Sequence, residues 1–157
     1  MTLSVLSNRL NPFDPKAALL AKHAQHVVLV HFPIGLFVAG VIFDLIARWK
    51  KREGLAEAAY YNLLGAAIAA IPAAITGILA WQFQLEGQKL KGILLLHLVF
   101  ACVSTLMILL VWWLHLRSRR IGTVPPQYLI WIELAVVAVV AATGHLGGFL
   151  SGVNGPG

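Results

Sequence analysis

The sequence contains few charged residues. Asp, Glu, Lys and Arg together make up 11% of the 157 positions, and six of these residues are acidic. A soluble domain typically carries about twice that share of charge. Hydrophobic residues make up 59% of the chain and the mean hydropathy is +0.82. These values exclude a soluble domain. They also argue against nucleic-acid binding despite the net charge of +6, because the basic residues lie between long apolar runs.

Cysteine is nearly absent as well. The only cysteine is Cys102, which lies inside an apolar run, so the chain has no disulfide framework. The opening stretch "MTLSVLSNRLNPFDP" lacks the apolar core and small-residue cleavage site of a signal peptide. We therefore expect no cleavable leader in this stretch.

Four long apolar runs are present, each near the roughly 20 residues that cross a bilayer. They predict transmembrane helices at about 29–48, 58–82, 92–116 and 126–149. The fold class expected is all-α, an integral membrane antiparallel four-helix bundle with a short N-terminal interfacial helix. Residues 1–28 would form the tail and interfacial helix, which starts at Asp14 and Pro15, and 29–157 the four-span bundle. Pro33 is expected to bend the chain where these two parts meet.

The basic residues predict the orientation in the membrane. Two connections are strongly basic, with Arg48, Lys50, Lys51, Arg52, Arg117, Arg119 and Arg120, whereas the short loop on the opposite side holds Lys89 and Lys91. The positive-inside rule then places both basic connections in the cytoplasm and both termini outside. We expect a multi-pass protein of the bacterial inner (cytoplasmic) membrane.

Small residues recur every four positions in the second run, at Gly65, Ala69, Ala73 and Gly77. Such a stripe allows a neighbouring helix to approach closely, which is the simpler interpretation. The alternative is that the stripe leaves room for a flat ligand.

The histidines are predicted to gather at one depth. His31 and His97 lie near the starts of spans that run in the same direction, and His145 lies near the end of a span that runs in the opposite direction. All three then lie roughly 6–10 Å inside the same membrane boundary, at about 1.5 Å per residue. His26 and His23 lie just above them. Ionisable side chains within spans usually face the bundle interior and mark function, although a single histidine often serves only to join helices.

Haem b is the cofactor that this arrangement favours. Haem iron binds two imidazoles, and four-helix bundles commonly hold it. We predict one haem or two, with His31 and His97 as the first pair and His145 and His26 as the second. Glycines near these histidines would admit a porphyrin, and lysines at the same end would contact its propionates; the candidates are Gly77, Gly144, Gly147, Gly148, Lys22, Lys89 and Lys91. Copper or zinc on the same histidines is the alternative.

Three further polar residues lie toward the other end of the spans. His115 is expected to be an interfacial residue beside Trp112 and Trp113, without a ligand role. Asp44 and Glu133 are expected to pair with nearby arginines such as Arg48. A proton path that starts from the two carboxylates is the alternative.

The opening motif resembles a known family. "HVVLVHFPIGLFVAGVIFDLI" carries a histidine, four apolar residues and His-Phe-Pro-Ile, followed by a Phe-Asp pair. This pattern is similar to an uncharacterised family of bacterial four-helix membrane proteins, domain of unknown function twenty-two thirty-one. The resemblance extends through "AAIPAAITGILAW", His97 and "GHLGGFLSGVNGPG", although Ala80 stands near the place of an acidic residue that often occurs in the family. It implies the fold far more than a function.

The function expected is electron transfer by a membrane-embedded b-type haem protein near the outer face of the membrane. The sequence contains no evident catalytic dyad, so an electron carrier or subunit is favoured over a free-standing enzyme. The partners expected are the lipid bilayer and a redox partner protein or larger membrane complex, with a homo-oligomer as a further option. The alternatives are an accessory subunit of a respiratory or photosynthetic complex that ligates a pigment, and a copper- or zinc-handling membrane protein.

Overall fold

A computed structural model describes residues 22–84, 87 and 89–151 of the chain. It contains four helices: α3 (Lys22–Lys50), α4 (Glu53–Gln84), α5 (Gly92–Arg120) and α6 (Leu129–Leu150). All four are long and apolar enough to cross a membrane. The predicted all-α transmembrane bundle is confirmed.

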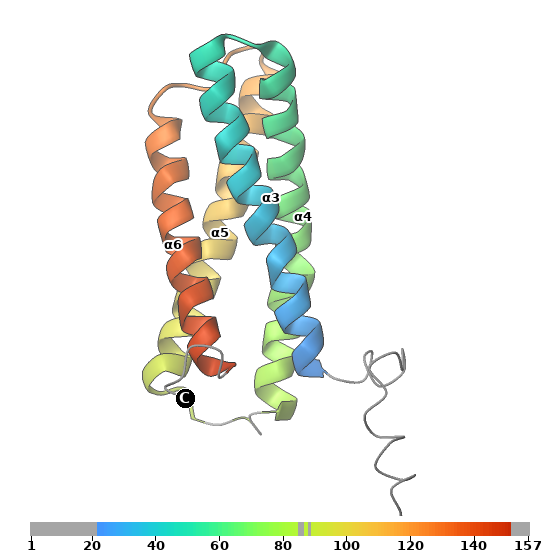
Figure 1. Ribbon diagram of the computed structural model, residues 1–157, viewed down its shortest axis with the longest axis vertical. Helices are drawn as coiled ribbons and strands as arrows, with labels where there is room; N and C mark the ends of the chain where they lie inside the picture. Colours follow the sequence, from blue (N-terminus) through green and yellow to red (C-terminus); the bar gives the residue numbers. More distant parts are fainter. Residues whose placement is uncertain (1–21, 85–86, 88, 152–157) are drawn as a thin grey trace, which may run out of the picture.

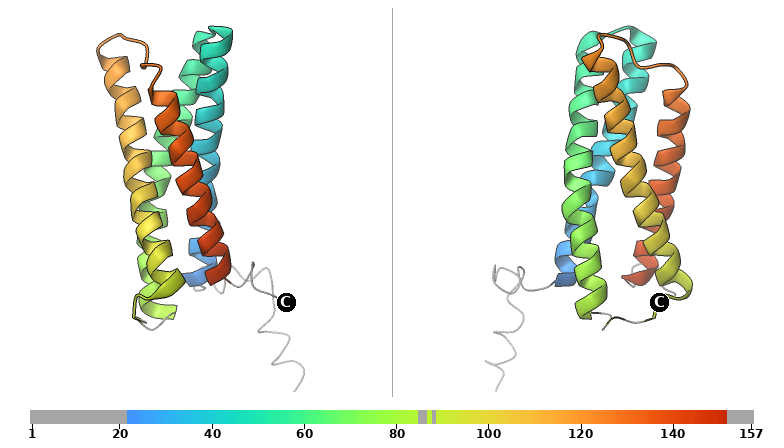
Figure 2. Two further views of the ribbon diagram at one scale, coloured as in Figure 1. Left: turned by 90° about the vertical axis from the view of Figure 1, so that its left-hand side faces the viewer. Right: turned by 180° about the vertical axis from the view of Figure 1, so that it is seen from behind.

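The helices form two antiparallel hairpins that pack side by side (Figures 1 and 2). α3 packs most extensively against α4, and α5 packs against α6; α4 also contacts α5, and α3 contacts α6. This cyclic order places α3 and α5 on opposite corners of the bundle. The start of α3 and of α5 and the end of α4 and of α6 therefore lie at the same end (Figure 1).

Close packing within the first hairpin depends on small residues. A Cβ added to Gly40 of α3 would lie 2.9 Å from the Leu63 side chain of α4, and one added to Gly65 would lie 3.2 Å from Leu36. Such distances leave no space for a side chain, so the two backbones approach closely at the glycines. The small-residue stripe of α4 packs against α3, as the simpler interpretation predicted.

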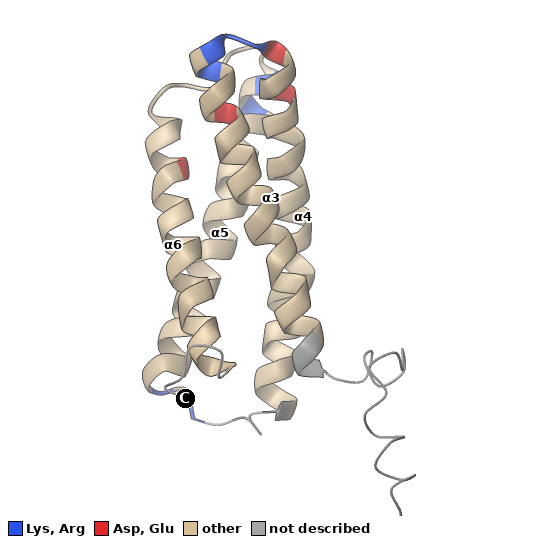
Figure 3. Ribbon diagram, viewed as in Figure 1, with Lys and Arg blue, Asp and Glu red and all other residues tan. Residues whose placement is uncertain are grey.

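The connections divide the bundle into two ends. The end that we call the basic end holds the α3–α4 turn and the α5–α6 connection, where Lys and Arg gather (Figure 3). The exposed rings of Trp49, Trp131 and Tyr128 lie at this end too, as expected for residues of a membrane interface. The opposite end, which we call the histidine end, carries His26, His31, His97 and His145.

Burial differs between the two ends. Buried residues of α5 begin at Ser104, and those of α6 stop at Val140. The stretches 92–103 of α5 and 141–150 of α6, which reach the histidine end, contain no buried residue. The apolar core lies in the other half, around Phe37, Leu63 and Val111. The second hairpin is therefore well packed toward the basic end and much less so toward the histidine end.

The start of the first span differs from the expectation. α3 continues through Pro33 without interruption, and residues 22–28 belong to α3 itself. A transmembrane helix tolerates proline because neighbouring groups can satisfy the carbonyl that the missing N–H leaves free. The bend expected at Pro33 therefore does not interrupt the helix. The predicted helix start at Asp14 and Pro15 lies outside the described residues.

Candidate functional site

His26 lies in the interface of the first hairpin, against the small-residue stripe of α4. A Cβ added to Gly77 would lie 2.9 Å from Cε1 of the His26 ring, so the glycine is what makes space for the imidazole. Nδ1 of His26 lies 3.3 Å from the hydroxyl oxygen of Thr76. The ring is therefore held by two consecutive residues of the neighbouring helix.

His97 occupies an equivalent position in the second hairpin. A Cβ added to Gly147 of α6 would lie 3.1 Å from Cε1 of the His97 ring. Nδ1 of His97 lies 3.1 Å from the backbone carbonyl oxygen of Thr143. Each hairpin thus holds one half-buried imidazole against a glycine of its second helix.

The partners of these rings determine which nitrogen carries the proton. The Thr143 carbonyl can only accept, so Nδ1 of His97 donates to it. The Thr76 hydroxyl lies 2.9 and 3.0 Å from the carbonyl oxygens of Pro72 and Ala73, and it accepts from Nδ1 of His26 when it donates its one proton to either of them. A neutral imidazole that donates from Nδ1 keeps a lone pair on Nε2. His97 is therefore held in the tautomer that can ligate a metal through Nε2, and His26 has the same tautomer when it donates to Thr76.

The other two histidines of this end are more accessible. His31 is exposed, and its Nδ1 donates to the carbonyl of Val27 one turn earlier in α3, at 2.6 Å. His145 is exposed too, and its ring packs edge-on against Phe149 with 5.0 Å between the centroids. The tautomer of His31 also leaves its Nε2 lone pair available.

The remaining candidate residues lie around the histidine end. Gly144 has Ile34 as its nearest neighbour, 4.0 Å from the Cβ position, and Gly148 lies within α6. Lys89 and Lys91 are exposed in the connection between α4 and α5. The Lys22 and His23 side chains lie outside the described part of the structure.

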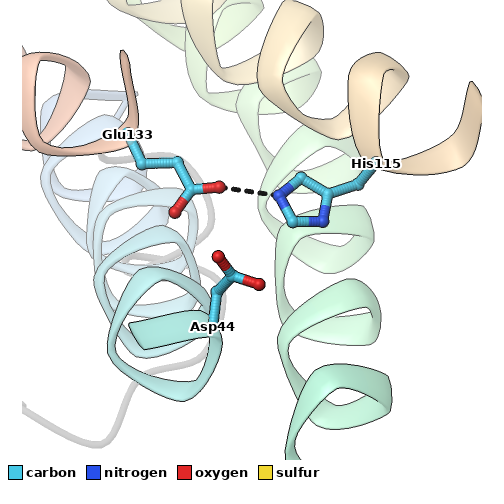
Figure 4. Close-up of side chains that lie close together, drawn as sticks. All are labelled: Asp44, His115 and Glu133. Atoms are coloured by element: carbon cyan, nitrogen blue, oxygen red, sulfur yellow. Dashed lines mark hydrogen bonds and ion pairs between the residues drawn. The ribbon is translucent and has the colours of Figure 1, made fainter. Parts of the chain in front are cut away.

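A second polar cluster lies inside the bundle toward the basic end (Figure 4). Asp44 of α3, His115 of α5 and Glu133 of α6 are 4%, 5% and 0% exposed. Nε2 of His115 donates to Oε1 of Glu133 at 2.7 Å. One ligand atom from each of the three side chains can be chosen so that all lie within 4.8 Å of one another. We call these three residues the Asp–His–Glu cluster.

Arg48 connects this cluster to the α5–α6 connection. Its Nε donates to Oδ2 of Asp44 at 2.6 Å, and its Nη1 donates to the carbonyl of Pro125 at 2.8 Å. The pairing expected between Asp44 and Arg48 is present. Glu133 pairs with His115 instead, and His115 is buried in the bundle rather than interfacial, so both of those expectations were wrong.

The cluster could have been found from the sequence by the depth argument applied to the histidines. Asp44 lies near the end of α3, His115 near the end of α5 and Glu133 near the start of α6, which places all three at one level of an antiparallel bundle. His115 was instead expected to lie at the interface, and the two carboxylates were expected to pair with arginines.

Comparison with known proteins identifies the family. No curated protein and no solved structure matches the chain. The family model described as "Predicted membrane protein (DUF2231)" matches residues 22–155, which include all four helices. The chain therefore belongs to the DUF2231 family of predicted membrane proteins, as the opening motif suggested.

Proposed function

We propose that the chain is a membrane-embedded b-type haem protein that transfers electrons near the outer face of the bacterial inner membrane. The observation that supports this proposal most directly is the state of His26 and His97. Each ring lies against a glycine of the neighbouring helix and has Nδ1 within hydrogen-bond distance of an oxygen of that helix, an arrangement in which Nε2 would be the ligand atom. Bis-histidine ligation of haem iron needs two such imidazoles, supplied from facing sides of a bundle.

The two residues that we propose would hold the haem iron are His26 and His97. The two residues come from different hairpins and from helices on opposite corners of the bundle. At this end α5 and α6 contain no buried residue, so a ligand there would displace little packed core of the second hairpin. His31 was our first choice from the sequence, but its exposed ring is bonded to its own helix, which makes it the weaker candidate.

The surrounding residues would set the properties of the site. When bound, haem supplies reversible one-electron exchange. A hydrogen bond from Nδ1 fixes the orientation of a ligating imidazole and raises its basicity, which is the role that we assign to Thr76 and to the Thr143 carbonyl. Gly77 and Gly147 allow each ring to approach the neighbouring helix. Lys89 and Lys91 are exposed at the same end and could contact propionates.

A redox partner would meet the protein at the histidine end. A site close to that membrane boundary lies within reach of a soluble or membrane-bound carrier on the same side. By the positive-inside rule, that side is the outer, non-cytoplasmic side of the membrane.

The test is the absorption spectrum of the purified protein in detergent, reduced minus oxidised. We expect the sharp α band of bis-histidine haem b, and we expect His26→Ala and His97→Ala each to abolish it. His115→Ala is the control, because His115 lies in the other cluster and should leave the haem content unchanged. His31→Ala should also retain the band if His26 is the ligand from α3.

Three results would contradict the proposal. Full haem content in both the His26→Ala and the His97→Ala proteins would remove the proposed site. A colourless wild-type protein with stoichiometric copper or zinc that is lost in these two variants would favour metal handling. A colourless protein with no bound metal would favour an accessory subunit.

A further inference from the structure

The Asp–His–Glu cluster has no part in the proposed haem site. We propose that it binds one divalent first-row transition-metal ion, for which zinc is the representative probe. The inference is independent of the haem proposal, because the cluster lies toward the opposite end of the bundle (Figures 3 and 4).

The first argument is the donor set. Three helices each contribute one buried side chain, and the three ligand atoms already lie within 4.8 Å of one another. Two carboxylates and one imidazole are ligands that zinc and its neighbours in the first transition row accept. Calcium and magnesium prefer oxygen ligands alone, so the histidine disfavours them.

The second argument is an oxygen without a partner. Oε2 of Glu133 is buried and has no hydrogen-bond partner, whereas Oε1 of the same carboxylate accepts from His115. Figure 4 shows that the carboxyl groups of Glu133 and Asp44 approach each other. A buried carboxylate oxygen without a partner is costly, and two carboxylates that face each other repel. A cation between them would relieve both effects.

The third argument concerns charge. Arg48 forms its ion pair with Asp44, and no arginine or lysine is paired with Glu133 among the described residues. When the His115 ring is neutral, one carboxylate charge of the cluster is uncompensated. Buried charges are normally paired or coordinate a metal.

Binding would require small movements of the side chains. Zinc lies about 2.0–2.2 Å from nitrogen and oxygen ligands, so tetrahedral donors are about 3.3 Å apart. The present spacing of up to 4.8 Å would contract by about one or two ångströms through rotation of the side chains. If the ion binds Nε2 of the neutral His115 ring, a metal–nitrogen bond forms at Nε2 and the ring proton moves from Nε2 to Nδ1, so the ring stays neutral and there is no net release of a proton from it.

A cavity lies near the cluster at the basic end. A cavity of about 260 Å³ lies between the end of α5 and the start of α6, and Ser118 and Leu129 are among its lining residues. These two residues are about one helical turn from His115 and Glu133 respectively. The cavity therefore comes within one turn of the cluster from the side of the α5–α6 connection.

The experiment is a zinc titration of the full-length protein in detergent after treatment with a chelator. We expect one zinc ion per chain that depends on the cluster, with the stoichiometry and affinity measured by calorimetry. Glu133→Gln keeps an acceptor for His115 but removes the charge, and it should weaken zinc binding at least about tenfold. Asp44→Asn should weaken it similarly.

Two controls separate this site from other sources of binding. Glu57→Gln removes an exposed carboxylate near the basic end and should leave the affinity unchanged. His97→Ala tests the histidine end and should also preserve the site of the cluster. Circular dichroism and size-exclusion chromatography establish that each variant is folded.

The proposal fails if the wild-type protein binds no zinc, a result that needs no variant. It also fails if Glu133→Gln and Asp44→Asn, both folded, bind zinc as tightly as the wild type, or if His97→Ala removes all binding. If the wild-type protein binds no zinc, the facing carboxylates of Asp44 and Glu133 would share a proton rather than a metal ion.

Discussion

His115 donates a hydrogen bond to Glu133 across the α5–α6 interface. The donor Nε2 and the acceptor Oε1 lie 2.7 Å apart in the interior of the bundle. The two residues come from consecutive helices at the same depth. Polar contacts between transmembrane helices select one rotation and one register from the many that apolar surfaces allow. The pair therefore fixes how α6 faces α5 near the basic end.

The first prediction concerns this pair. His115→Leu leaves a buried carboxylate without its donor, and Glu133→Leu leaves the His115 N–H without its acceptor, so we expect each single variant to lose about 1–3 kcal/mol of stability. Replacement of both residues, as in His115→Leu with Glu133→Leu, should restore most of that loss, because an apolar pair has no unsatisfied group. The measurement is reversible unfolding in mixed micelles for the two single variants and the double variant. Additive losses in the double variant would show that the hydrogen bond is not the cause.

The second prediction concerns the contact between Gly77 and His26. Gly77→Ala places a Cβ 2.9 Å from the His26 ring and forces the imidazole to move. We expect lower haem content and a loss of about 1–3 kcal/mol of stability from overpacking. Gly35→Ala is the matched control, since nothing lies within 4 Å of its Cβ position. Equal behaviour of the two alanine variants would mean that the His26 contact has no role in binding or stability.

The third prediction concerns Arg48. Its guanidinium contacts the Asp44 carboxylate and the Pro125 carbonyl at the same time, which the single ammonium group of lysine cannot reproduce in the same geometry. We expect Arg48→Lys to loosen the α5–α6 connection and increase tryptic cleavage after Arg119 and Arg120. Arg119→Lys serves as the control, because its ion pair with Glu57 is exposed and contributes little. A cleavage rate identical to that of the wild type would contradict the role assigned to Arg48.

The fourth prediction concerns orientation. The variants Arg52→Cys and Thr123→Cys are made in a protein in which Cys102 is replaced by serine. Each should react with a membrane-impermeant thiol reagent only after the cells are broken and the reagent reaches the cytoplasmic side of the membrane. Lys89→Cys should react with the same reagent in cells whose outer membrane has been permeabilised and whose inner membrane is intact. All three positions are exposed in connections, so access to the thiol reports the side of the membrane. The reverse pattern of labelling would invert the topology that we infer from the basic residues.

The sequence predicts the helices of this protein well and the faces of the helices poorly. Hydropathy identifies a span directly, because the bilayer demands a long apolar segment, and all four spans are present. The antiparallel order then places the histidines at one end. The rotation of each helix depends on packing, and these helices are apolar nearly all round, so the sequence carries little information about which residues face inward.

His31 and His115 illustrate the limit. The motif drew attention to His31, yet its ring is exposed, whereas His115 was assigned to the interface and is buried. What distinguishes them is the presence of a partner at the same depth on a neighbouring helix. Glu133 provides that partner for His115, while the Nδ1 bond of His31 stays within α3.

The division into two hairpins has a consequence for biogenesis. α3 and α4 are complete before α5 leaves the ribosome, and domains generally fold from the N-terminus during synthesis. The first hairpin can therefore assemble in the bilayer by itself, through the glycine contacts between α3 and α4. Neither proposed site is complete at that stage, because His97, His115 and Glu133 belong to the second hairpin. Both sites form only when the second hairpin docks, so the maturation of the protein and the acquisition of its ligands become a single event.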